Sequence, residues 1–173
     1  MIKNILPILL ISGLLVSLAS AAEKEKKDLR GNYDAIEVVR FTAKDGTNFP
    51  PDYAVTLVED MVKELQATGK FKQVLREGEK PENADAKVMR VTGTITEFNP
   101  GSRAKRYLVG FGSGKTKIVA QVKYMDVATG EQLWEDKMDG KVWIGAFGGE
   151  SIGATRGLAK ELAKKTKAHF FSE

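Results

Sequence analysis

The chain has 173 residues, a formal net charge of +4, one histidine and no cysteine. This length fits a single domain, since most single domains contain about 100–150 residues. The absence of cysteine excludes a disulfide framework, a thiol nucleophile and any cysteine-ligated metal site. With His169 as the only imidazole, histidine-rich metal sites are excluded too. We therefore expect a protein that holds no metal or other cofactor.

The N-terminus has the order of a secretory signal peptide. Residues 1–21 carry one charge, residues 5–16 are mainly apolar, and small side chains dominate residues 17–22. Ala19 and Ala21 supply the small side chains that signal peptidase needs for cleavage after Ala21. We expect residues 1–21 to be removed on export, which would place the protein in the periplasm.

A retained membrane anchor is the alternative to cleavage, because residues 5–22 contain no charge and reach the length of a short spanning helix. Pro7 and Gly13 make such a helix a poor one. A lipid anchor would need a cysteine where Ala21 stands, so we expect no lipidation. Residues 22–33 are charged and poor in apolar groups, and we predict a disordered leader there.

Residues 34–171 are expected to form one domain. Their apolar side chains alternate with period two in some segments and recur every three or four residues in others, which predicts strands and helices respectively. The predicted strands are 35–41, 71–75, 88–98, 117–127 and 133–143, and the predicted helices run from Pro51 to Gly69 and from Ser151 to Phe170.

The strand at 88–98 shows how the sheet should lie. Met89, Val91 and Ile95 share one face, and three threonines share the other, which suits a sheet face open to water. The order of strand, helix, strand, three long strands and helix predicts an α+β fold. We expect a mainly antiparallel sheet of about five strands with two helices packed on one face.

The motif at residues 110–116, GFGSGKT, ends like a phosphate-binding loop. Such a loop needs a glycine where Val109 stands, and a helix directly after it. The residues after Thr116 predict a strand, so no helix N-terminus would be there to bind a phosphate. We interpret the segment as a glycine-rich loop or a bulged strand edge.

The carboxylates and the histidine do not form a catalytic pattern. Glu135 and Asp136 are adjacent in a strand and so point to opposite faces. Alternating charges at residues 135, 137, 139 and 141 are typical of a solvated face. His169 lies in the last turn of the final helix, where a cation is stabilised, and no second histidine exists to form a relay. We therefore expect that the protein is not an enzyme.

The glycine-rich segment Gly145–Gly149 precedes the final helix, whose start could bind a small anion. Glu150 opposes this with its own negative charge, and Ser151 as a helix cap is the better interpretation. A cleft near this segment is nevertheless the place where a small ligand could bind or be hydrolysed, and that function is the alternative to protein binding.

A basic, glycine-rich segment at residues 100–117 is the candidate contact surface. Because export separates the protein from cytoplasmic nucleic acid, we expect its partner to be an envelope protein or an anionic envelope surface. A solvated loop without a partner is the simpler alternative. Self-association through residues 106–109 as an exposed edge strand is a third interpretation. The candidate contact residues are Arg103, Lys105, Arg106, Tyr107, Gly110, Gly112, Gly114 and Lys115, with Lys117 adding to the charge.

The stretch from Thr68 to Trp134 contains TGKFKQV, VTGTITEF, the GFGSGK segment and a D-x-x-T-G hairpin that begins at Asp126. With these motifs the chain resembles a family of small exported bacterial proteins classed as domain of unknown function 4410. It is more loosely similar to periplasmic modules of the curli-secretion and penicillin-binding-protein-activator type. The resemblance implies a sheet with helices on one side and a role in binding or assembly. It implies no catalytic residues.

The sequence therefore favours a non-enzymatic periplasmic protein that binds a partner in the cell envelope or assists envelope assembly. Its partner, its molecular role and its oligomeric state do not follow from the sequence.

Overall fold

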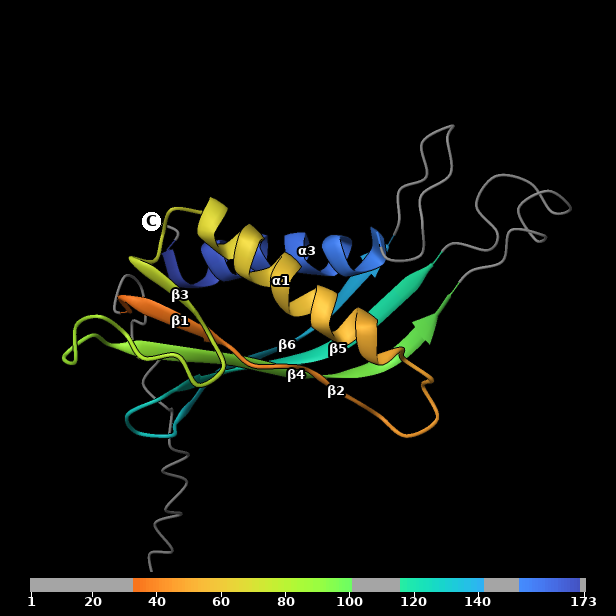
Figure 1. The fold of residues 1–173 in the computed structure, drawn as a ribbon, viewed down its shortest axis with the longest axis horizontal. Coiled ribbons are helices and arrows are strands. Elements are labelled where there is room, and N and C mark those ends of the chain that lie inside the picture. The colour runs from red at the N-terminus through yellow and green to blue at the C-terminus, as the bar shows by residue number, and fades with distance from the viewer. Residues whose placement is uncertain (1–32, 101–115, 142–152, 172–173) are drawn as a thin grey trace, which may run out of the picture.

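The structure is a computed structural model that describes residues 33–100, 116–141 and 153–171. These residues form two layers, a twisted sheet and a pair of helices that lie on the same face of it (Figure 1). The predicted α+β fold with two helices on one face is therefore confirmed. The expected signal peptide, residues 1–21, and residues 22–32 of the expected leader lie outside the described residues. The last residue of that leader, Tyr33, is buried in the domain because its hydroxyl bonds to Asp126, so the prediction of disorder is wrong at this position.

The sheet contains six strands in the order β3-β1-β4-β5-β6, with β2 pairing separately with β4. The strands are β1 (Ala35–Val38), β2 (Thr42–Ala43), β3 (Gln73–Arg76), β4 (Val88–Asn99), β5 (Lys117–Asp126) and β6 (Gln132–Lys141).

The sheet is mixed, whereas the sequence predicted a mainly antiparallel one. Strands β4, β5 and β6 are antiparallel, but β1 runs parallel to both β3 and β4. The helix between β1 and β3 explains the first pair, because a helical crossover returns the chain in its original direction and so produces parallel strands. Strand β4 is parallel to β1 because residues 77–87 carry the chain from the end of β3 to the other side of β1. Period-two alternation marks a strand but carries no information on the direction of its neighbours.

The two helices are α1 (Pro51–Ala67) and α3 (Gly153–Phe171). Helix α1 begins at a proline, which is tolerated where no intrahelical donor is needed. It is followed by Gly69, whose φ of +62° is the left-handed conformation that glycine adopts at no steric cost. Its predicted apolar stripe is buried against the sheet through Leu57, Met61, Val62 and Leu65.

The hydrophobic core lies between the helices and the sheet. Along β4, Met89, Val91 and Ile95 point into it, as their alternation predicted. Phe41 joins them from the segment between β1 and β2, and its ring lies against Gly93, where a Cβ atom would come within 2.6 Å of it. The largest fully buried side chains also include Tyr124, Phe170, Ile36, Leu57, Met61, Leu65, Ile118, Met138, Leu158 and Leu162.

Neither α1 nor α3 is long and apolar enough to cross a membrane, and the same holds for the rest of the chain that the structure describes.

Candidate contact surface at the loop end of the sheet

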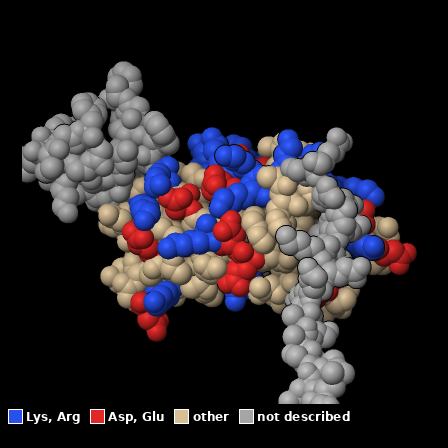
Figure 2. All heavy atoms as spheres, turned by 180° about the vertical axis from the view of Figure 1, so that it is seen from behind, with Lys and Arg blue, Asp and Glu red and all other residues tan. Residues whose placement is uncertain are grey.

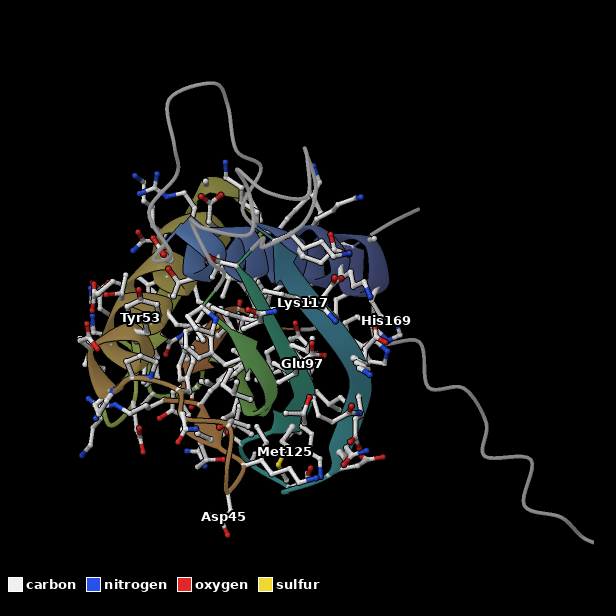
Figure 3. The ribbon with its side chains drawn as sticks, turned by 90° about the vertical axis from the view of Figure 1, so that its right-hand side faces the viewer. Asp45, Tyr53, Glu97, Lys117, Met125 and His169 are labelled. Carbon is white, nitrogen blue, oxygen red and sulfur yellow. The ribbon has the colours of Figure 1, made fainter. Side chains whose placement is uncertain are left out.

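The predicted contact residues lie outside the described part of the chain. They fall in residues 101–115, between β4 and β5, and the alternative ligand site falls in residues 142–152, between β6 and α3. The structure does describe the four points where these two segments join the domain. Asn99 pairs with Lys117, and Lys117 pairs with Lys141, so three of these points lie side by side. We call this end of the sheet the loop end; it faces the viewer in Figure 3.

The join at residues 100 and 116 is held firmly. The Thr116 side chain is fully buried, and its hydroxyl donates a hydrogen bond of 3.0 Å to the carbonyl oxygen of Pro100. Strand β5 begins at the next residue. This confirms that a strand, and not a helix, follows the Gly-Lys-Thr motif. A phosphate-binding loop is incompatible with this arrangement, because it needs a helix N-terminus there.

Lys117 does not act as a free cation of the basic segment, as the sequence had suggested. Its Nζ atom lies 3.0 Å from the Oε2 atom of Glu97 on β4. The two side chains are partly exposed and face each other across β4 and β5 (Figure 3). This ion pair neutralises the charge of Lys117, which directly follows the segment 101–115 and Thr116. The pairing depends on the register of β4 and β5, which spacing along the sequence does not show.

The join at residues 141 and 153 depends on two glycines. A Cβ atom on Gly140 would lie 2.4 Å from the carbonyl oxygen of Ala154 and from the amide nitrogen of Leu158. A Cβ atom on Gly157 would lie 2.8 Å from the carbonyl oxygen of Lys141. The backbones of β6 and α3 therefore touch, and this contact fixes the start of α3 over the end of β6.

Three aromatic rings form a cluster beside the loop end that no pattern in the sequence indicates. Phe49, Tyr53 and Phe98 come from the segment before α1, from its first turn and from the end of β4. Their ring centroids lie 5.3–6.1 Å apart with nearly perpendicular planes. This edge-to-face arrangement is the favourable one for aromatic rings. It ties the start of α1 to the end of β4 and so stiffens the frame of the loop end.

The opposite end of the sheet is where the chain enters the domain. Tyr33 is buried, and its hydroxyl donates a hydrogen bond of 2.9 Å to Asp126. Asp126 opens the D-x-x-T-G hairpin and also accepts the backbone N–H of Thr129 at 2.8 Å. Gly130 follows with a φ of +72°. The motif thus has a structural role: it closes the β5–β6 turn and anchors the first described residue.

The electrostatics of this end follow from the same contacts. The backbone N–H of Thr129 is the largest influence that lowers the pKa of Asp126, and the Tyr33 hydroxyl lowers it further. Burial, together with the hydrogen bond to Asp126, raises the pKa of Tyr33. Both shifts favour a phenol that donates and a carboxylate that accepts at neutral pH.

His169 lies in the last turn of α3, as predicted, but its environment does not favour a cation. Its ring stacks on Trp134 with centroids 4.2 Å apart and an interplanar angle of 6°. Burial lowers the pKa of His169, and the nearby Asp136 carboxylate only partly opposes this effect. These contacts favour a neutral imidazole that packs against Trp134 and do not support the expected helix-stabilising cation.

The carboxylates of β6 do point to opposite faces, as strand geometry requires. Asp136 lies on the helix side, where the Nζ atom of Lys165 is 2.7 Å from its Oδ2 atom. Glu135 lies on the open side and accepts a hydrogen bond of 3.0 Å from Gln121 of β5. The Lys165 side chain is one-third exposed. The two carboxylates cannot act together on one substrate atom.

No group of three or more histidine, cysteine, aspartate or glutamate side chains is arranged to hold a metal ion in the part of the chain that the structure describes. Every buried polar side-chain atom of these residues has a hydrogen-bond partner.

Comparison with solved structures shows where else this fold occurs. A PelC dodecamer from Paraburkholderia phytofirmans is 20% identical, covers 76% of this chain and 87% of that chain, and gives a TM-score of 0.53. A second structure of a PelC dodecamer from this organism gives 18% identity, the same TM-score and coverages of 78% and 87%. The hypothetical protein CT253 from Chlamydia trachomatis is 10% identical, with coverages of 79% and 97% and a TM-score of 0.51. At these identities the similarity shows the fold alone.

Among curated proteins no sequence matches this chain. The family model described as Domain of unknown function (DUF4410) matches residues 20–166. That match covers α1, all six strands of the described sheet, the two segments at the loop end and α3 as far as residue 166. The chain therefore belongs to the family of the Domain of unknown function (DUF4410).

Proposed function

We propose that this chain is a non-enzymatic protein of the bacterial envelope that binds other proteins and assists assembly there. The signal-peptide pattern of residues 1–21 supports export to the periplasm. The PelC structures support assembly, since they show that proteins of this fold form dodecamers. No catalytic residue, metal or cofactor is part of the proposal.

The observation that carries the proposal is that the chain enters the domain at one end of the sheet while the two loop segments leave from the other end. The chain enters next to the β5–β6 hairpin, where Tyr33 is bonded to Asp126. The segments 101–115 and 142–152 leave from the loop end, at the other end of strands β4, β5 and β6 (Figure 1). A domain built in this way presents one end to a partner while the other end is connected to the N-terminal leader.

The charge of the contact segment gives the class of partner. Residues 101–115 contain four basic residues and no acidic residue, whereas many charged side chains of the described residues are paired with each other. A basic segment on an otherwise balanced domain attracts an acidic surface. The proposed partner therefore presents carboxylates to Arg103, Lys105 and Arg106.

The histidine and the carboxylates support a binding role rather than catalysis. The imidazole of His169 is stacked on an indole ring, and Asp136 is neutralised by Lys165. Glu135 faces the other side of the sheet, where it hydrogen-bonds with Gln121. Each group is engaged in packing or pairing within the domain.

The test is crosslinking in the native envelope, followed by identification of the captured proteins. We expect the triple charge reversal of Arg103, Lys105 and Arg106 to glutamate to reduce capture of specific partners by about tenfold, because three attractive contacts become repulsive. A matched control reverses Lys70, Lys80 and Lys87, three exposed lysines that precede β3 or lie between β3 and β4 and do not adjoin the loop end. An unchanged set of partners in the triple variant would exclude residues 101–115 as the contact surface.

Small-ligand binding or hydrolysis near Gly145–Gly149, and self-association through residues 106–109, both concern residues outside the described part of the chain. They stay predictions.

A further inference from the structure

Strand β6 forms one edge of the sheet. It pairs with β5 on one side and with no other strand among the described residues. From Trp134 to Lys141 its pairing with β5 runs without interruption, from Trp134 opposite Tyr124 to Lys141 opposite Lys117. The stretch contains no proline. An edge of this length presents a row of backbone N–H and C=O groups that another strand can pair with.

The side chains on the open face of β6 alternate in sign. Glu135, Lys137, Asp139 and Lys141 occupy every second position, while the residues between them face α3. An edge that is protected against pairing usually carries charges that repel a second strand. Alternating signs do the opposite, because they can match a second strand of the same sequence. Figure 2 shows acidic and basic side chains interspersed on the side of the molecule away from the viewer of Figure 1.

We propose that β6 pairs antiparallel with β6 of a second copy of this chain, about a two-fold axis that passes through Met138. In this register Glu135 of one copy lies opposite Lys141 of the other, and Lys137 lies opposite Asp139. Symmetry repeats both pairs, so all four charges of each strand meet an opposite charge. This inference rests on the proposed assembly function and names one partner and one surface for it.

The neighbouring registers are excluded by the same charges. In an antiparallel pair of identical strands, the two-fold axis passes through the position of one residue. A change of register therefore moves the axis by a whole residue along the strand. An axis through Lys137 places that lysine against its own copy and Glu135 against Asp139. An axis through Asp139 places that aspartate against its own copy and Lys137 against Lys141. Like charges directly opposite each other destabilise a strand pair. Axes through Asp136 or Gly140 avoid such pairs among these four charges but give an oppositely charged partner within β6 to only two of the four. The axis at Met138 is therefore the one that matches all four.

The state of these side chains within one copy agrees with the inference. The ammonium group of Lys137 makes no ion pair among the described residues, and the side chain is exposed. Asp139 is paired only along its own strand, with Lys141 at 2.7 Å. In the proposed dimer the Asp139 carboxylate of the second copy would lie opposite the ammonium group of Lys137. Asp139 can accept this contact because its present partner, Lys141, is on the same strand. The buried side of the strand, including Met138 and Gly140, would not change its contacts with α3.

The first test is sedimentation velocity of the purified protein at several concentrations, with charge-swap variants. We expect a dimer for the unmodified chain. Lys137→Glu and Asp139→Lys should each weaken dimerisation by about tenfold or more, because each places like charges opposite each other twice. The double variant restores opposite charges and should dimerise again. Lys63→Glu, on the exposed side of α1, serves as the matched control and should dimerise normally.

The second test uses the fact that the chain contains no cysteine. The double variant Lys137→Cys with Asp139→Cys should form disulfide-linked dimers on mild oxidation, because directly opposite Cβ atoms lie about 4.5–5.5 Å apart. Either single variant should not, since the residue opposite it is not cysteine. Far-ultraviolet circular dichroism of each variant verifies that it is folded.

Two results would overturn the inference. One is a protein that sediments as a monomer at every concentration and gives no crosslinked dimer. The other is an oligomer whose stability is unaffected by Lys137→Glu, since its interface would then lie elsewhere. Neither result removes the proposed function, which fails only if the envelope crosslinking experiment on residues 101–115 captures no specific partner.

Discussion

The contact between β6 and α3 can be tested with the substitution Gly140→Ala. The added Cβ atom would lie 2.4 Å from the carbonyl oxygen of Ala154 and 2.4 Å from the amide nitrogen of Leu158. Ordinary van der Waals contact begins near 3.4 Å, so α3 has to move away from β6 by about 1 Å. Both clashing atoms belong to the backbone of one helix, so no side-chain rotation can relieve the overlap.

We expect Gly140→Ala to lower the free energy of unfolding by about 3 kcal/mol, at the upper end of the range for overpacked cores. That is a large share of the 5–15 kcal/mol that stabilises a typical domain. For a domain of this size the melting temperature should fall by about 6–12 °C. Urea unfolding followed by circular dichroism measures the free energy directly, and an unchanged m-value would show that the unfolded state is the same.

Gly130→Ala is the matched control, since it makes the same chemical change where no atom lies within 4 Å. Its φ of +72° still imposes a left-handed conformation on alanine, at a cost of about 1–2 kcal/mol. Asparagine tolerates that conformation, so Gly130→Asn should recover part of the loss, whereas Gly140→Asn should be worse than Gly140→Ala. A Gly140→Ala protein as stable as the unmodified chain would show that β6 and α3 do not touch as described.

Further predictions concern buried polar groups and titration. The Thr166 hydroxyl donates to the backbone and accepts from the Tyr124 phenol at 2.6 Å, so Tyr124→Phe removes that donor and should lower the free energy of unfolding by about 1–2 kcal/mol. A double-mutant cycle with Thr166→Val should show a coupling energy of about 1 kcal/mol. Losses that simply add would contradict the hydrogen bond. The single histidine, His169, should titrate below 6.5 in proton NMR because burial lowers its pKa, and Trp134→Ala should raise that value; a pKa of 6.5 or above would contradict the stacked geometry. Since the folded state then binds fewer protons than the unfolded state, the stability due to a neutral His169 is complete above pH 6.5 and decreases as the pH falls toward the folded pKa. Asp136 behaves similarly at lower pH: its lysine partner lowers its pKa from 3.8, so its contribution is present above pH 3.8 and lost as the pH falls through the folded pKa, and Asp136→Asn should flatten acid unfolding in that range.

Local patterns in the sequence determined most of the secondary structure. The stripe of Leu57, Met61 and Leu65 predicted α1, and the alternation from Met89 to Ile95 predicted the buried face of β4. These patterns succeed because the periods of 3.6 and 2 are properties of the backbone itself. The strand after Thr116 was also predictable, and with it the exclusion of a phosphate-binding loop.

Other features required the tertiary structure, because they depend on residues far apart in the chain. The pairing of Lys117 with Glu97 follows from strand register, and the parallel pairing of β1 with β3 follows from the crossover through α1. The stacking of the His169 ring depends on Trp134, which lies 35 residues earlier in the chain. Periodicity records which side of an element is buried but not which element covers it.

The sequence by itself determined the expectation of one domain without disulfides, the export pattern at the N-terminus and the buried side of each element. Only the tertiary structure decided that Gly140 and Gly157 let α3 touch β6 and that residues 101–115 and 142–152 join the domain at one end of the sheet. It also decided that the alternating charges of β6 lie on a strand with one partner, β5, among the described residues. The physical reason is that each of these features is a relation between elements, set by packing and strand order, while local sequence dictates only the conformation and the buried side of each element.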